Sequence, residues 1–310
     1  MKRIIFCIMF ICFALILRAQ QDPQFSQNMF NILSVNPAYA SAEKDMLVSV
    51  INRQQWVGFD NAPLTTVVNL SVPVKFGGTS HGLGLSIVRD ELGFEKNTGV
   101  KFSYSYQNKM NNGSLHFGVS VGFQNNALKG DWFVPEGNDF TSVQDDLGSA
   151  TIDEGKMVLD PSLGFFYLSD NFYAGLSVLH VTEPSVAYSE SVEIYLARHY
   201  YATAGYTLKL DETWEVLPSV FYKTDAVVSQ IDINSLLRYN KKIWGGVSYR
   251  VDDAIVGMVG VLFNNGIQIG YAYDISTSKI AKASHEFLLT YRFNTKLESR
   301  NQKYKSIRFL

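Results

Sequence analysis

Apolar and polar residues alternate along most of the chain, and the pattern is clearest between residues 115 and 123. One face of that segment is apolar and the other is polar or small: Leu115, Phe117, Val119, Val121 and Phe123 against His116, Gly118, Ser120 and Gly122. Side chains alternate between the two sides of a strand, so the segment is an extended strand with two unlike walls. Strands of about 9–11 residues with this alternation are typical of outer-membrane barrels. The pattern predicts an all-β transmembrane barrel with a polar lumen.

Alternating segments of this kind recur about fourteen times. The expected strands span residues 45–52, 65–74, 81–90, 97–107, 115–124, 159–168, 171–181, 198–208, 214–224, 229–240, 242–251, 254–263, 266–275 and 284–293. They run almost end to end without a linker, which indicates one antiparallel barrel rather than several domains. Pro218 lies inside the ninth strand and cannot donate a ladder hydrogen bond, so a bulge or a break is expected there.

The connections between the expected strands alternate in length. Short ones follow even-numbered strands and several carry turn residues, as in Asn112-Gly113 and Asn265-Gly266. Long ones follow odd-numbered strands, at 53–64, 125–158, 182–197 and 275–283. Outer-membrane barrels have short periplasmic turns and long extracellular loops. The parity therefore predicts an even strand number, with both the N- and the C-terminus in the periplasm.

Charged residues within the strands are expected to face the lumen. A Lys or Arg on the lipid face near mid-bilayer costs about 2–4 kcal/mol. The expected lumen charges are Lys101, Asp232, Arg238, Glu286 and Arg292. They either form a salt-bridged interior or line a wet channel. The segment 254–263 is apolar on both faces, which favours a packed inner side or a plug beneath that strand.

The first nineteen residues have the layout of a secretory signal peptide. Lys2 and Arg3 precede an apolar run from Ile4 to Leu17, and cleavage is expected at Ala19-Gln20. An uncleaved anchor is the alternative, but about 14 apolar residues are short for a membrane-spanning helix. Both cysteines of the chain, Cys7 and Cys12, lie in this segment. The mature chain therefore lacks disulfides and thiolate metal sites.

The remaining regions follow from this division. Residues 45–293 form the barrel, residues 20–44 an N-terminal segment, and residues 294–310 a periplasmic tail. The N-terminal segment contains Phe25, Met29, Phe30 and Tyr39 and is too apolar for a free tail, so it is expected to be a plug or lid. After cleavage the chain has 24 basic and 29 acidic residues. This mild excess of negative charge argues against nucleic-acid binding.

No pattern in the sequence indicates catalysis, a cofactor or a metal. Gly118-Val-Ser120-Val-Gly122 matches the nucleophile elbow of serine hydrolases, but that elbow needs a strained turn between a strand and a helix. Ser120 lies in the middle of an expected strand. The histidines lack metal-ligand spacing, and the acidic residues of the longest loop lack the spacing of a calcium loop. A solvated loop is favoured there over a calcium site, and the chain is not expected to be an enzyme.

Three stretches are more specific than the barrel pattern. They are residues 20–40, residues 53–63, and residues 270–278 continuing to His285-Glu286 and 291–293. With these motifs the mature chain resembles, along its whole length, the PorP/SprF family of type IX secretion system membrane proteins. Ile32 and Ser41 stand where that family would lead one to expect Pro and Gly.

The resemblance implies a non-enzymatic barrel of the bacterial outer membrane. Such proteins work beside a periplasmic ring of a lipoprotein and its partner, or beside a secreted adhesin with a C-terminal export domain, in some cases for gliding motility. A passive channel or hydrophobic-solute transporter is the alternative function, and a barrel lipase or protease is disfavoured. Binding energy concentrates in a few aromatic anchors. The candidate partner-binding residues are therefore the loop aromatics Trp56, Phe59, Trp132 and Phe133, although the loop of Trp56 and Phe59 is about as readily read as folded into the barrel mouth.

Overall fold

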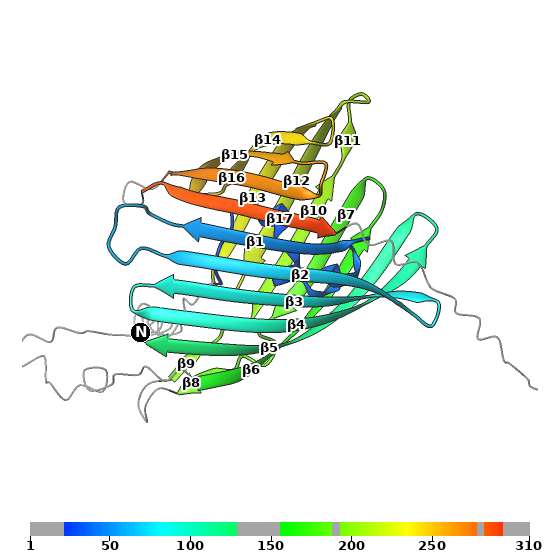
Figure 1. Cartoon of the computed structure of the whole chain (residues 1–310). Coiled ribbons are helices and arrows are strands. Elements are labelled where there is room, and N and C mark those ends of the chain that lie inside the picture. Colours follow the sequence, from blue (N-terminus) through cyan, green and yellow to red (C-terminus); the bar gives the residue numbers. More distant parts are fainter. Residues whose placement is uncertain (1–21, 129–155, 188–192, 278–281, 294–310) are drawn as a thin grey trace, which may run out of the picture.

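The computed structural model describes residues 22–128, 156–187, 193–277 and 282–293. These residues form a β-barrel with the N-terminal segment inside it (Figure 1). The strands of the barrel are β1 (Met46–Gln54), β2 (Leu64–Phe76), β3 (Thr79–Leu92), β4 (Glu95–Met110), β5 (Gly113–Leu128), β6 (Lys156–Leu168), β7 (Phe172–Leu179), β10 (His199–Tyr206), β11 (Leu208–Lys209), β12 (Trp214–Thr224), β13 (Ser229–Tyr239), β14 (Ile243–Arg250), β15 (Ala254–Leu262), β16 (Ile267–Ser276) and β17 (Ser284–Phe293). Between β7 and β10, β8 (Ser185–Ala187) and β9 (Glu193–Tyr195) form a separate two-stranded sheet.

Every strand of the barrel pairs with its neighbours in antiparallel fashion. The sheet closes because β1 pairs with β17, β7 pairs with β10, and β10 and β11 both pair with β12. Since β11 continues β10, the wall has fourteen strands, as the alternation predicts. A closed sheet leaves no unpaired strand edge, which is the condition for crossing a bilayer with strands. Among the described residues, no helix is long and apolar enough to span a membrane.

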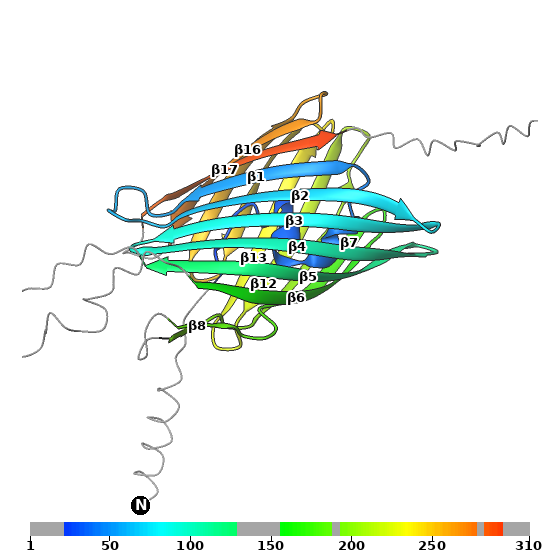
Figure 2. The ribbon, with the colours of Figure 1, turned by 60° about the horizontal axis from the view of Figure 1, so that its bottom comes forward.

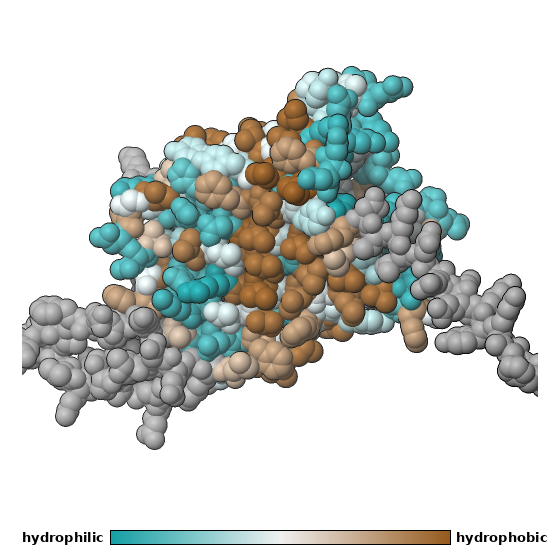
Figure 3. All heavy atoms as spheres, viewed as in Figure 1, coloured by the Kyte–Doolittle hydropathy of each residue, from teal (hydrophilic) through white to brown (hydrophobic). Residues whose placement is uncertain are grey.

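The two faces of the wall differ as the alternation predicts. On β5 the side chain of Val119 is 50% exposed on the outside, whereas Ser120 is 3% exposed on the inside. On β13 Ile231 and Ile233 point outward, and Asp232 between them is buried. Figure 3 shows the outward apolar side chains as a band across the middle of the barrel, with polar residues towards its ends. This band is the surface that the hydrocarbon core of a membrane would cover.

Pro218 interrupts one ladder without shifting its register. On the side of β13, β12 is paired without a break, and Pro218 stands opposite Ser235. On the other side, Gly205 pairs with Ser219 and Leu208 with Val216, and the ladder is open between these pairs. The register is the same on both sides of the gap, so no residue is inserted. The expected break is present, and there is no bulge.

The N-terminal segment runs lengthwise through the lumen. It contains η1 (Asn28–Phe30), α2 (Ile32–Val35) and η2 (Pro37–Ser41), which Figures 1 and 2 show in dark blue inside the wall. Asp22 lies beside His199, at the start of β10. Near the other end of the segment, Glu43 accepts a hydrogen bond from Arg292 at the end of β17.

Asp22 and Phe293, the first and last described residues, consequently lie at opposite ends of the barrel. Strand parity predicts the side of the membrane on which β1 begins. The end of the barrel at which β1 begins is also the end at which β17 finishes. A count of strands cannot show that residues 22–45 cross the lumen before β1 begins. The two termini themselves lie outside the described residues, so the expectation that both are periplasmic stays a prediction. The signal peptide and the tail that the sequence predicts lie outside the described residues.

Candidate functional site

Glycines in the wall allow the backbone of η2 to lie directly against the barrel. A β-carbon built on Gly82 would lie 2.2 Å from the carbonyl carbon of Ala40, and one on Gly118 would lie 2.1 Å from the nitrogen of Ala38. Any larger side chain at these positions would occupy the space of η2. The small inward residues that the sequence shows on β3 and β5 are thus part of the surface on which the N-terminal segment packs.

Hydrogen bonds hold η2 against this part of the wall. The hydroxyl of Ser105 donates to the carbonyl of Ala38 at 2.8 Å, and the hydroxyls of Ser41 and Ser105 lie 2.6 Å apart. Ser41 also bonds to Nδ1 of the buried His116 at 2.7 Å. At the start of η2, the Asn36 side chain accepts from the backbone nitrogen of Ala38 and donates to the carbonyl of Phe165. The contacts are made to the wall on several strands, so η2 has a defined position.

A buried ionic cluster holds the first part of the N-terminal segment. Arg53 lies 2.7 Å from Asp274 and 3.2 Å from Glu286, and Arg250 lies 3.1 Å from Asp274 and 3.4 Å from Asp232. All five side chains are almost completely inaccessible to solvent. Buried charges are tolerated when they are paired and their remaining hydrogen-bonding capacity is satisfied.

The N-terminal segment supplies much of that capacity. The carboxylate of Glu286 accepts hydrogen bonds from the backbone nitrogens of Ser26 and Gln27 at 2.7 and 2.8 Å. The hydroxyl of Ser26 lies within hydrogen-bonding distance of Asp274, Arg53 and Arg250. The side chain of Asn28 donates to Asp232 at 3.1 Å. The segment is therefore a structural member of the cluster, because its removal would take hydrogen-bond partners away from buried charges.

The five lumen charges proposed from sequence lie in different surroundings. Asp232 and Glu286 belong to the ionic cluster. Arg238 pairs with Glu215 at 2.6 Å, and Arg292 pairs with Glu43 at 2.7 Å. Lys101 is half-buried on the inner face of β4, opposite Gly122. The five do not pair with one another. The ion pairs of the other four are made with residues that the alternation alone did not single out.

Apolar packing completes the attachment of the segment. Phe25 is buried in a cluster with Val256 and Met258 of β15, and Met29 and Phe30 pack against the same cluster. The ring of Phe30 lies 5.0 Å from that of Trp244. The inner side of β15 is therefore packed against the N-terminal segment, which explains why residues 254–263 are apolar on both faces.

The loop between β1 and β2 presents two of the aromatic candidates. Trp56 is 40% exposed and Phe59 is 46% exposed. The loop is fixed to the start of β17: the backbone nitrogen of Val57 donates to the carbonyl of Ala283, and Lys282 donates to the carbonyl of Gly58 at 2.9 Å. The ammonium group of Lys282 also lies 4.4 Å from the centre of the Phe59 ring, a cation–π geometry. Trp132 and Phe133 lie outside the described residues.

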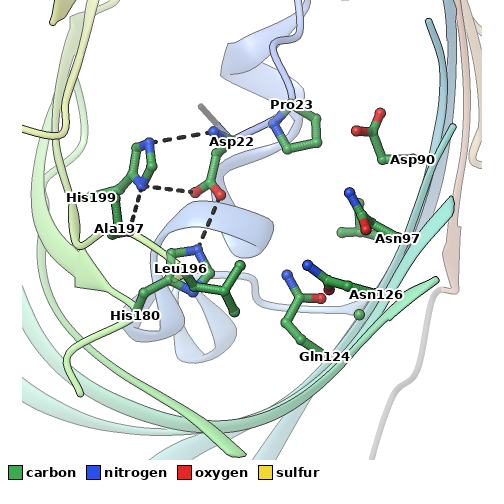
Figure 4. A pocket seen from close by; sticks show the side chains of 12 residues that line it. Asp22, Pro23, Asp90, Asn97, Gln124, Asn126, His180, Leu196, Ala197 and His199 are labelled. Carbon is green, nitrogen blue, oxygen red and sulfur yellow. Dashed lines mark hydrogen bonds and ion pairs between the residues drawn. The ribbon is translucent and has the colours of Figure 1, made fainter. Parts of the chain in front are cut away.

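A small polar pocket lies at the same mouth of the barrel (Figure 4). Its volume is about 60 Å³, and amide and carboxyl side chains line one side of it: Asp90, Asn97, Gln124 and Asn126. On the other side Asp22, His180 and His199 lie together. Nε2 of His180 is 3.0 Å from Asp22, and Nδ1 of His180 is 3.0 Å from Asp160.

The electrostatics of this histidine are unusual. Burial alone would lower the pKa of His180, but the Asp22 and Asp160 carboxylates outweigh burial and raise that pKa to about 9. Burial likewise works to raise the pKa of Asp22, yet His180 and His199 hold it well below its usual range. Sequence spacing could not reveal the group, because its members are 19 or more residues apart and only the closed barrel brings them together.

The hydrolase-like motif lies within a regular strand of the wall. Ser120 lies in the middle of β5, where it stands in register with Ser103 of β4 and Ser162 of β6. The strained strand-to-helix turn of a nucleophile elbow is therefore not present at this serine.

A closed antiparallel barrel with an apolar outer band and a polar interior is a transmembrane barrel of the outer-membrane type. The family described as type IX secretion system membrane protein PorP/SprF matches residues 17–291. The chain belongs to this family, and it is a membrane protein of the type IX secretion system.

No curated protein matches the chain. Several solved outer-membrane proteins are similar to the chain at low sequence identity. The outer membrane protein Omp33 of Acinetobacter baumannii has a TM-score of 0.49 and 9% identity over 82% of this chain and 100% of that one. The monoaromatic hydrocarbon channel CymD has a TM-score of 0.49 and 12% identity over 85% and 92%. The toluene transporter TbuX of Ralstonia pickettii has a TM-score of 0.46 and 12% identity over 83% and 92%. Similarities of this size say nothing about what the present chain binds or transports.

Proposed function

We propose that this protein is a non-enzymatic receptor of the type IX secretion system that holds an exported surface protein at the outer mouth of its barrel. The observation that carries the proposal is the occupied lumen. The protein's own N-terminal segment fills the interior and is bound by buried charges, by hydrogen bonds and by apolar packing. Because the lumen of this barrel is occupied, a partner protein is expected to bind at one of its two mouths rather than pass through it.

The spaces left beside the segment also support a binding role. Three cavities that border the segment have volumes of about 60, 160 and 20 Å³. The first two are large enough for water molecules or a small solute, and far too small for a polypeptide. An exported protein is therefore expected to bind outside the lumen.

The loop of Trp56 and Phe59 is the best described candidate for that contact. Exposed aromatic side chains on a loop that is already held in place lose little conformational entropy on binding, which favours their use as anchors. The chemistry fits a protein partner such as an adhesin with a C-terminal export domain. A link to the periplasmic ring would use the opposite mouth, where the short turns lie.

The test is a double substitution, Trp56→Ala with Phe59→Ala. Removal of an anchor typically costs about 2 kcal/mol or more of binding, roughly thirtyfold in affinity. The variant should fold and insert normally, as judged by heat-modifiable gel mobility, while display of the exported partner on the cell surface falls.

Phe76→Ala is the matched control. Phe76 is 77% exposed and lies at the turn between β2 and β3, at the opposite mouth. Normal surface display in this variant, together with loss in the double variant, supports the outer mouth as the binding surface. The reverse result would assign partner binding to the periplasmic mouth and contradict the proposal.

A further inference from the structure

Three side chains with metal-binding chemistry meet where the N-terminal segment enters the lumen. One ligand atom from each of Asp22, His180 and His199 lies within 4.8 Å of the others. The two imidazoles are buried, and the Asp22 carboxylate is mostly buried. Among the described residues, this is the group of three His, Cys, Asp or Glu side chains whose ligand atoms lie close enough together to hold one metal ion.

The surroundings of His180 have the arrangement of a metal-ligating histidine. Its Nε2 points toward Asp22 and the centre of the group, while its Nδ1 lies 3.0 Å from Asp160. In metal sites the second ring nitrogen usually donates to a carboxylate or a carbonyl, which fixes the tautomer and the ring orientation. Asp160 lies in β6 and is buried, so it has the position of such a supporting residue.

The other two side chains are also held in place. The hydroxyl of Tyr201 donates to Asp22 at 2.5 Å, and the ring of Tyr201 stacks on His199 at 6.2 Å between centroids. Two imidazoles and a carboxylate form a donor set that suits zinc, with one position left for water. The ion would displace the proton that the Asp22 and Asp160 carboxylates hold on His180. The adjacent pocket of about 60 Å³ has room for that water.

We propose that Asp22, His180 and His199 bind a divalent transition metal ion, with Zn²⁺ as the best match, and that the ion fastens the start of the N-terminal segment to the barrel wall. Asp22 belongs to that segment, His180 follows β7 and His199 begins β10 (Figure 4). One ion would therefore join the segment to two strands of the wall. This inference does not depend on the proposed receptor function.

The experiment uses the full-length protein in detergent, stripped of metal and titrated with ZnCl₂ by calorimetry. The wild type should bind one equivalent. The variant His180→Ala with His199→Ala should lose stoichiometric binding, and Asp22→Asn should weaken it. Asp160→Asn should weaken binding by about 10–100-fold, the usual effect of losing a supporting residue. The variant His81→Ala with His285→Ala removes two histidines elsewhere and should match the wild type.

X-ray absorption spectra at the zinc edge, recorded on the zinc-loaded wild type, provide a readout that needs no variant. They should show nitrogen and oxygen neighbours at about 2.0–2.2 Å, with imidazole scattering. Absence of one-to-one binding by the wild type would overturn the proposal. Unchanged binding in a His180→Ala and His199→Ala variant that retains heat-modifiable mobility would overturn it as well.

Discussion

Gly118 on β5 and Ala38 in η2 touch so closely that a β-carbon on Gly118 would lie 2.1 Å from the Ala38 nitrogen. The absence of a side chain at this position allows the N-terminal segment to rest on the wall. Since Gly118 stands in an otherwise regular strand, its role is in the lumen and not in a turn.

Gly118→Val should therefore loosen the N-terminal segment while the barrel remains closed. Overpacking of a tight contact typically costs about 1–3 kcal/mol, and here it falls on the contact between η2 and β5. We expect faster protease cleavage within residues 22–45 of the purified protein and unchanged resistance of the barrel. Gly257→Val is the control, because a β-carbon on Gly257 would meet no atom within 4 Å. Equal cleavage rates in the two variants would contradict this role of Gly118.

The ionic cluster gives a second prediction. Arg53→Ala would leave Asp274 and Glu286 with one cation fewer in a buried site, and breaking a buried pair in this way costs about 3–5 kcal/mol. We expect the midpoint of denaturant unfolding to fall sharply. Arg89→Ala removes an exposed arginine that pairs with Glu91, and such surface pairs contribute about 0–1 kcal/mol. Similar losses in both variants would argue that the cluster does not hold the fold together.

Much of this wall could be predicted from sequence, because strand alternation is a local pattern. The outward Val119 and inward Ser120 are assigned correctly by counting, and so is the number of strands. The parity of loop lengths also predicts that β1 begins at the periplasmic end of the barrel, which stays a prediction. Each of these inferences depends on neighbours in the chain, and a closed antiparallel sheet preserves such neighbours in space.

The candidate sites could be predicted only in part, since they combine residues distant in sequence. The sequence marks Asp232 and Glu286 as inward charges, but their partners Arg53 and Arg250 become evident only when the strands close. The same is true of Asp22 and His199, which are 177 residues apart. The path of residues 22–45 along the lumen leaves no periodic signal, because short helical turns and prolines have none.

A further prediction concerns conductance. In planar bilayers the intact protein should conduct poorly, because the N-terminal segment occupies the lumen, and deletion of residues 21–40 should raise the current. That deletion also removes the hydrogen bonds from Ser26 and Gln27 to Glu286. Adding Glu286→Gln to the deletion therefore tests whether the exposed carboxylate makes the open barrel prefer cations to anions. Large currents from the intact protein would favour the channel function over the receptor function.

The last prediction concerns orientation in the membrane. Both cysteines of the chain lie in the expected signal peptide, so single cysteines can be introduced at either mouth without a competing thiol. Asp60 is exposed in the loop between β1 and β2, and Glu212 is exposed in the turn between β11 and β12 at the opposite mouth. With long loops outside and short turns in the periplasm, Asp60→Cys should react with a membrane-impermeant maleimide on intact cells, and Glu212→Cys should react only after the outer membrane is permeabilised. The unsubstituted protein gives the background. Labelling of Glu212→Cys on intact cells, with Asp60→Cys protected, would reverse the orientation and would move the surface of Trp56 and Phe59 to the periplasm.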